Sequence, residues 1–203
     1  MIIFMWSGPR NLSTALMRSF ENRLDTKVLD EPFYAYYLKK TNLKHPMKKE
    51  IIKSYPNSQN KIIKLITTKP KNKEIFYQKH MTHHIIKNTK LDWVIKGYNC
   101  FLIRHPAKVI NSYVKKNSLK NINDIGFKKQ FEIFNKIKNK NLKYIVVNAD
   151  TILKDPNKTI KKICKLLNIR FSSKMLKWPS GKRISDGIWS KVWYKNVERS
   201  TSF

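Results

Sequence analysis

Residues 2–16, IIFMWSGPRNLSTAL, set the architecture expected of the whole chain. Ile2–Trp6 is a continuous apolar run of β-branched and aromatic residues, which predicts a strand covered on both faces. Gly8-Pro9 ends this strand, because both residue types interrupt regular structure. Beyond it, Leu12, Leu16 and Phe20 recur at the spacing of one helix face. The stretch therefore predicts a buried strand, a tight turn and a helix.

The turn after this strand has the features of an anion site. Its backbone N–H groups lie at a helix N-terminus, where unpaired donors and the helix dipole attract negative charge. The residues that we expect to bind a phosphate are Gly8, Pro9, Arg10, Asn11, Leu12, Ser13 and Thr14. The turn lacks the G-x-x-x-x-G-K-S/T pattern of a Walker A loop. Many strand-turn-helix units with Gly and Ser bind no ligand. From this stretch alone, a phosphate site and a turn without a ligand both stay open.

The composition fits one globular domain. The chain has 203 residues, 41% of them hydrophobic and 12% aromatic, which favours a single α/β domain over residues 1–203 and excludes a disordered chain. No apolar run approaches the roughly 18 residues of a membrane span, and the apolar opening is shorter than a signal peptide. Cys100 and Cys164 agree with a reducing compartment. We therefore expect a cytoplasmic protein with no membrane partner.

The chain is strongly basic, with a formal net charge of +30. Such a charge can mark a nucleic-acid-binding protein. The basic residues are nevertheless spread through nearly every segment and are mostly lysines, so we expect a solvated basic surface and no specific nucleic-acid partner. Each arginine in a turn is more informative, because its planar guanidinium binds phosphate through two hydrogen bonds, which lysine cannot do.

Strands and helices alternate along the rest of the chain. Further strands are expected at Thr26–Leu29, Glu74–Met81, Asn99–Ile103 and Tyr144–Val147. Helices are expected at Leu12–Asn22, Lys48–Ser54, Gln59–Thr67, Ala107–Lys116, Asp124–Lys138 and Asp155–Leu167, and one begins in the aromatic run Phe33–Leu38. This alternation predicts a three-layer α/β/α fold with a mostly parallel central sheet of about five strands.

Two of the expected strands end on titratable residues. Glu31 follows the second strand, at the sheet edge where α/β proteins bind ligands, so it is a candidate acid/base or substrate-orienting group; a helix-capping carboxylate is the alternative. The third strand ends on Lys79-His80, which reads as a general base beside a cation. His83 and His84 follow closely, but no Glu or Cys accompanies these histidines, so we expect no metal site.

A second arginine lies in a comparable turn. Arg104 ends the fourth strand and is followed by Pro106 and a helix that carries Ser112. One ligand with two separated phosphates would account for both Arg10 and Arg104.

These residues resemble the sulfotransferases that use 3′-phosphoadenosine 5′-phosphosulfate (PAPS). Residues 7–14, SGPRNLST, are similar to their 5′-phosphosulfate loop, with Arg10 in the place of the more familiar lysine. Arg104 with Pro106 and Ser112 resembles their 3′-phosphate motif. The segments DEPFY at 30–34, KHMTHH at 79–84 and SDGIW at 185–189 extend the resemblance, to a bacterial sulfotransferase-like subgroup, over essentially the whole chain. The resemblance implies a P-loop NTPase-like fold without NTPase chemistry and without a metal.

The resemblance also implies roles for particular residues. PAPS would be the sulfonate donor, His80 or Glu31 the base, and Arg10 the group that stabilises the leaving phosphate. Because Lys79 and His80 are adjacent on a strand, they point to opposite faces, and at most one of them faces the sulfonate. Further donor contacts would come from the tail, at Lys182, Arg183 and Trp189.

The function implied is transfer of a sulfonate from PAPS to a hydroxyl, or secondarily an amine, of a small-molecule or carbohydrate acceptor. A P-loop kinase acting on a small molecule or nucleotide is one alternative. A PAPS-binding protein without activity is another.

Overall fold

The computed structural model describes residues 1–41, 43–115, 118–119 and 121–203. Its centre is a sheet of five parallel strands in the order β2-β3-β1-β4-β5, so the opening strand lies in the middle. The strands are β1 Ile2–Ser7, β2 Thr26–Asp30, β3 Ile75–Met81, β4 Tyr98–Ile103 and β5 Tyr144–Asn148. The expected parallel sheet of about five strands is confirmed.

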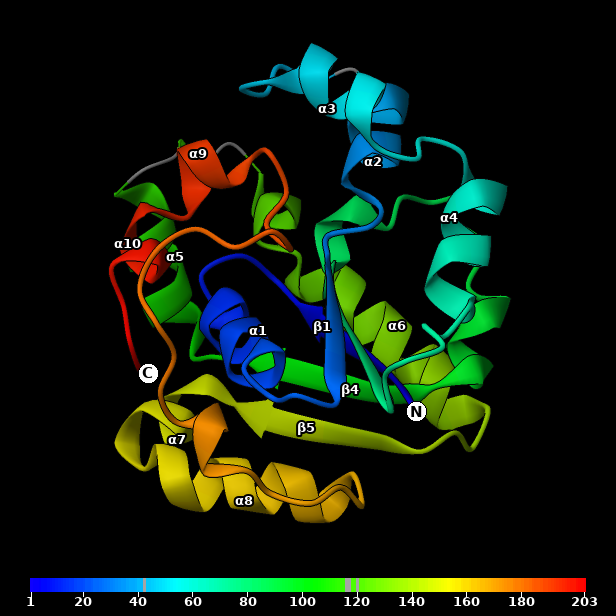
Figure 1. The fold of residues 1–203 in the computed structure, drawn as a ribbon. Coiled ribbons are helices and arrows are strands. Elements are labelled where there is room, and N and C mark those ends of the chain that lie inside the picture. The colour runs from blue at the N-terminus through cyan, green and yellow to red at the C-terminus, as the bar shows by residue number, and fades with distance from the viewer. Residues whose placement is uncertain (42, 116–117, 120) are drawn as a thin grey trace.

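Helices occupy most of the connections between strands (Figure 1). The α-helices are α1 Ser13–Glu21, α2 Tyr34–Thr41, α3 Lys48–Ser54, α4 Gln59–Thr67, α5 Pro106–Val114, α6 Phe127–Asn139, α7 Ala149–Lys154, α8 Pro156–Leu166, α9 Ser190–Trp193 and α10 Lys195–Glu198. Short 3₁₀ turns are η1 Thr82–His84, η2 Asp92–Lys96, η3 Ile122–Ile125 and η4 Ser173–Met175. The expected end of the fifth helix, Lys116, lies outside the described residues.

Helix α7 was not expected from the sequence. Asn148 ends β5 and also caps this helix, because its side-chain oxygen accepts a hydrogen bond from the Asp150 backbone N–H at 2.9 Å. Asp155 then caps α8 by accepting from the Lys158 backbone N–H at 2.9 Å, with Pro156 at the first helical position. Two capping residues seven positions apart thus divide this segment into two helices.

The sheet carries a core on each face, which confirms the three-layer arrangement. Ile3 and Met5 of β1 pack in one core, with residues of α1, α7 and α8. Phe4 and Trp6 pack in the other, with residues of α4 and α6. The alternation along a single strand explains why the opening run had to be apolar at every position.

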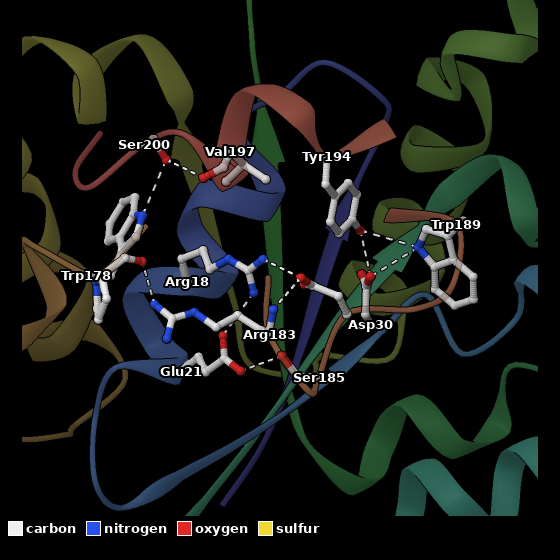
Figure 2. Close-up of polar contacts among 12 residues, drawn as sticks. Arg18, Glu21, Asp30, Trp178, Arg183, Ser185, Trp189, Tyr194, Val197 and Ser200 are labelled. Atoms are coloured by element: carbon white, nitrogen blue, oxygen red, sulfur yellow. Dashed lines mark hydrogen bonds and ion pairs between the residues drawn. The ribbon is translucent and has the colours of Figure 1, made fainter. Parts of the chain in front are cut away.

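The C-terminal tail returns across the sheet and is tied to α1. Arg18, on the second turn of α1, is buried and pairs with Asp186 at 2.6 Å and with Glu21 at 3.1 Å. Figure 2 shows this group beside the contact that Trp189 and Tyr194 make with Asp30. Burial opposes the charge of Arg18, but the two carboxylates outweigh it and raise the pKa of the guanidinium. The tail is therefore a structural part of the domain. Among the described residues no helix is both long and apolar enough to cross a membrane.

Candidate functional site

The loop that joins β1 to α1 adopts a strained backbone. Arg10 has a φ of 64° and Leu12 a φ of 67°, both in the left-handed region that non-glycine residues avoid. Such a conformation costs roughly 1–2 kcal/mol per residue. It persists only where contacts with the surrounding structure hold it in place, and such residues are common at functional sites. Arg10, Leu12 and Thr14 are partly exposed, whereas Asn11 and Ser13 are buried.

Gly8 places this loop directly against the segment that precedes α6. A Cβ at Gly8 would lie 2.3 Å from the Ile125 carbonyl oxygen, so only glycine fits. Thr82 Oγ1 donates to the Gly126 carbonyl at 3.0 Å, and the Ser7 carbonyl lies 3.3 Å away. The start of the loop is therefore packed against the residues just before α6 and against the residue that follows β3.

Asn11 points into the protein and anchors the loop. Its Nδ2 donates to the Leu102 carbonyl on β4 at 3.3 Å. Gln130 of α6 donates to the same carbonyl at 2.9 Å and lies 3.1 Å from the Trp6 carbonyl. Asn11 thus acts in positioning the loop, while the backbone and Arg10 form its outer surface.

Arg10 and Arg104 come together at the ends of two neighbouring strands. Arg10 Nε donates to Ser112 Oγ at 2.9 Å, and Arg104 Nη1 donates to the Arg10 carbonyl at 3.1 Å. Arg104 Nε also donates to Asp150 at 3.3 Å. Burial and the Arg104 guanidinium lower the pKa of Arg10. The structure therefore brings together residues of the two expected phosphate motifs in one cationic surface that also carries a hydroxyl group.

A second group of charged residues is built around Lys79. Its Nζ donates to Asp30 at 2.7 Å, to Glu31 Oε1 at 2.6 Å and to Tyr194 Oη at 2.6 Å. Trp189 Nε1 adds a hydrogen bond of 3.1 Å to Asp30. Burial alone would lower the pKa of Lys79, but Asp30 and Glu31 outweigh it and raise the pKa.

Glu31 is the member of this group at the sheet edge. Its φ of 43° is again left-handed, and its side chain bonds Lys79 rather than a helix backbone. Burial, opposed by Lys79 and assisted by Asp30, raises the pKa of the Glu31 carboxyl. A carboxylate whose pKa is raised toward neutrality suits general-base chemistry. The Glu31 side chain is thus held by a buried cation and has the chemistry of a candidate acid/base group.

His80 lies on the other face of the sheet. Its ring packs against Trp6, Phe33 and Trp93 at centroid distances of 4.8, 6.2 and 5.3 Å, and its Nε2 lies 3.1 Å from Gln78 Oε1. Burial lowers the pKa of His80 to about 3. The adjacent Lys79 and His80 therefore do point to opposite faces, and it is Lys79 that joins Glu31.

The tail residues expected near the donor are dispersed. Lys182 is exposed, and Arg183 donates from Nη2 to the Pro179 carbonyl at 2.7 Å and from its backbone N–H to Asp186 at 2.9 Å. Trp189 is fully buried and faces Asp30 (Figure 2). Trp189 therefore belongs to the hydrogen-bonded group of Asp30, Glu31 and Lys79, through its bond to Asp30.

Sequence reasoning missed Asp30, Tyr194 and Asp150 as partners of the site. Asp30 and Asp150 had a usable signal, since each stands at or just after the end of a strand. Tyr194 had none, because it meets Lys79 across 115 residues.

Comparison with known proteins agrees with these motifs. The family model described as a sulfotransferase domain matches residues 1–203. The chain belongs to the sulfotransferase family. The resemblance noted in the sequence is thereby confirmed over the full chain.

Curated relatives of this sulfotransferase-family chain occur in Arabidopsis thaliana. The branched-chain-amino-acid aminotransferase-like proteins 1 and 2 are 33% and 32% identical to it over 202 residues. The match covers 100% of this chain and 36% of each relative. The chain thus spans about a third of the length of the curated relatives it matches.

Solved sulfotransferase domains share the fold. The domain of the Synechococcus PCC 7002 olefin synthase superposes with a TM-score of 0.62 at 18% identity, covering 98% of this chain and 83% of that domain. The domain from the curacin biosynthetic pathway gives a TM-score of 0.58 at 18% identity, with coverages of 92% and 80%. With the parallel sheet, these matches confirm the expected three-layer α/β/α fold.

Proposed function

We propose that this chain transfers a sulfonate from PAPS to a hydroxyl group of a small-molecule or carbohydrate acceptor. One observation carries the proposal: Arg10 reaches Ser112 while Arg104 holds the Arg10 carbonyl, so two phosphate motifs form one surface. A ligand with phosphates at two positions fits such a surface better than a single phosphate chain. An amine is the second acceptor class.

The residues of this surface suit the donor. The strained β1–α1 loop presents backbone N–H groups and Arg10 to a 5′-phosphosulfate. Arg104 and Ser112 are the candidates for a 3′-phosphate, the group that distinguishes PAPS from ATP. PAPS supplies an already activated sulfonate, so no residue has to bind a metal. Among the described residues, no group of three His, Cys, Asp or Glu side chains could hold one.

Glu31 is the proposed base. It accepts the hydroxyl proton while the acceptor oxygen forms a bond to sulfur and the bond from sulfur to the phosphate oxygen breaks. The electron pair of the broken bond leaves on that phosphate oxygen, where Arg10 stabilises the charge. Adjacent strands lie about 4.8 Å apart, and β3 alone separates β2 from β1, so Glu31 lies about 10 Å across the sheet edge from the loop.

Lys79 is proposed to orient Glu31 rather than to touch the sulfonate. All three donor directions of its ammonium are used, on Asp30, Glu31 and Tyr194. His80 is not part of the proposal, because its ring is enclosed by aromatic side chains on the other face.

Thermal unfolding with nucleotides tests the donor site. A ligand that binds the native state raises its stability with the logarithm of concentration over Kd. Adenosine 3′,5′-bisphosphate should raise Tm more than ATP or AMP at equal concentration. A larger shift with ATP and Mg²⁺, together with ATP turnover, would establish the kinase alternative instead.

Release of labelled sulfonate from PAPS separates an enzyme from a binding protein. We expect release in the presence of an acceptor mixture and formation of the bisphosphate product. A chain that binds the bisphosphate but never releases sulfonate, with or without acceptor, would be the inactive PAPS-binding protein.

A further inference from the structure

Next to Glu31 the structure holds an imidazole that the proposed function does not yet use. His84 ends the η1 turn and is 2% exposed. Its ring stacks on Tyr34 at a centroid distance of 4.5 Å and an angle of 8°, and on Tyr37 at 4.8 Å and 27°. Stacked contacts with two buried tyrosines fix the plane and tilt of the ring.

This orientation aims one ring nitrogen at Glu31. His84 Nδ1 lies 4.0 Å from Glu31 Oε2, and it is buried without a hydrogen-bond partner among the described residues. Lys79 meanwhile occupies the other carboxylate oxygen, Oε1, at 2.6 Å. A separation of 4.0 Å is too long for a hydrogen bond, but an oxygen atom about 2.8 Å from each group would bridge them in a bent arrangement.

We propose that Glu31 Oε2 and His84 Nδ1 together bind the acceptor hydroxyl, and that they select a hydroxyl over an amine. This inference rests on the proposed function, since it assigns the acceptor side of the same site. Glu31 Oε2 takes the hydroxyl proton as the O–S bond forms. His84 donates its Nδ1–H to the same oxygen and holds it in line with the sulfonate.

The protonation of His84 follows from its surroundings. Burial, followed by the nearby His83, His45, Lys79 and His80, lowers the pKa of His84 well below its ordinary value, so the ring is neutral. A neutral imidazole carries one N–H. The carboxylate of Glu31 favours that hydrogen on the nitrogen that faces it, which is Nδ1.

Selection of the hydroxyl follows from counting lone pairs. A hydroxyl oxygen has two lone pairs and one hydrogen. It can accept from Nδ1 with one pair, attack sulfur with the other and give its hydrogen to Glu31. A neutral amine nitrogen has a single lone pair, which a hydrogen bond from His84 would occupy. The pair of residues therefore fits an alcohol or phenol and disfavours an amine.

A crystal structure with adenosine 3′,5′-bisphosphate tests the geometry without any turnover. We expect a water oxygen within about 2.6–3.2 Å of both Glu31 Oε2 and His84 Nδ1. Direct contact between the two side chains, or another protein group bonded to Nδ1, would overturn the proposal. Failure of the bisphosphate to bind would contradict the donor assignment, whereas the bridging oxygen would still be visible in crystals without ligand.

Kinetics with a matched acceptor pair test the selection. With PAPS as donor, 2-naphthol should be a better substrate than 2-naphthylamine by about tenfold or more in kcat/KM, the size of one well-placed hydrogen bond. His84→Phe keeps the stacking and should lose about tenfold with 2-naphthol, while His84→Asn, which keeps an N–H donor, should recover most of the loss. Equal activity of His84→Phe, or a preference for the amine, would overturn the proposal.

A control histidine lies against the same two tyrosines. His45 packs edge-on to Tyr34 and Tyr37 at 5.9 and 6.2 Å, but its Nδ1 is bonded to Tyr34 Oη at 2.9 Å. His45→Phe should leave the hydroxyl preference unchanged. If neither naphthyl compound is sulfonated, release of sulfate to water serves as the hydroxyl reaction. His84→Phe should slow that release while leaving bisphosphate affinity unchanged, and an unaltered rate would overturn the proposal.

Discussion

Arg10 on the loop after β1 donates from Nε to Oγ of Ser112 on α5, at 2.9 Å and across 102 residues of chain. The contact joins two motifs that follow neighbouring parallel strands. Because β1 and β4 are neighbouring parallel strands, the turns that follow them lie side by side at the same end of the sheet. The proposed donor site of this sulfotransferase-family chain therefore depends on the strand order as much as on the loop sequence.

Arg10→Ala should weaken binding of adenosine 3′,5′-bisphosphate. A hydrogen bond to a charged group contributes about 1.5–3 kcal/mol, so the expected loss is about tenfold to a hundredfold in Kd, measured by calorimetry. Arg170→Ala is the matched control. Its backbone carbonyl accepts a hydrogen bond from Arg23, which lies just before β2, at the end of the sheet where the strands begin. This variant should therefore bind the bisphosphate normally. Equal affinities in the two variants would remove Arg10 from the site.

Glu31→Gln should lower kcat by about 10²–10⁴-fold with little change in bisphosphate affinity, because it removes a positioned base. His80→Phe should retain most of the activity, since His80 is enclosed by aromatic rings. Rates of sulfonate transfer for the two variants, measured side by side, decide between them. A large loss in His80→Phe with normal turnover in Glu31→Gln would reverse the assignment.

The pH dependence of kcat should carry the mark of Glu31. Its pKa is raised above the ordinary value of 4.5, so the carboxyl keeps its proton to a higher pH than a solvated glutamate does. The base form is lost as the pH falls, and kcat should therefore decline on acidification, beginning above pH 4.5. This decline of kcat at acidic pH should be absent from the residual activity of Glu31→Gln. If the same decline persists in that variant, another residue acts as the base.

Tyr194→Phe should destabilise the fold and loosen Glu31. The hydroxyl donates to Asp30 at 2.6 Å and accepts from Lys79 at 2.6 Å, both buried. Leaving such partners unsatisfied costs about 1–3 kcal/mol, and for a chain of this size each kcal/mol lowers Tm by roughly 2–4 °C. Tyr144→Phe, on the partly exposed edge strand, should change stability by less than about 0.5 kcal/mol in urea unfolding. A Tyr194→Phe protein as stable as Tyr144→Phe would show that the buried network contributes nothing.

Gly8→Ala should disable the donor loop. The added Cβ would overlap the Ile125 carbonyl oxygen at 2.3 Å, so either the loop or the segment before α6 must move. Bisphosphate affinity should fall by more than about tenfold, since the backbone donors shift with the loop. Gly181→Ala is the contrast, because its φ of 105° is strained but nothing lies within 4 Å of the added Cβ. It should cost about 1 kcal/mol of stability and leave binding unchanged.

Much of the fold could be predicted because its signals are local. The helices Lys48–Ser54 and Gln59–Thr67 appear with the expected bounds, and the five strands lie where apolar runs predicted them. Helix α7 was missed because Asn148 serves both as strand end and as helix cap, and a sequence pattern marks only the first role.

In the candidate site, too, the residues with a local sequence signal could be predicted and the others could not. The turns that carry Arg10 and Arg104 were visible as breaks between apolar and helical patterns, and so was Glu31. Lys79 was visible as a cation at a strand end, and Asp30 stands at the end of its own strand. The meeting of both with Tyr194 was not visible, because the three side chains come together only through long-range packing. The choice between Lys79 and His80 was also out of reach, since strand alternation says that they diverge and not which face each takes.

By itself, then, the sequence determined the α/β alternation, the glycine and arginine of the first loop and the two motifs that we propose bind phosphate, all of which depend on a few neighbouring residues. Folding settled which of those residues meet. Strand order set Arg10 beside Ser112, and burial enclosed His80 while raising the pKa of Glu31. Desolvation and charge pairing depend on atoms far apart in the chain, and no local pattern contains them.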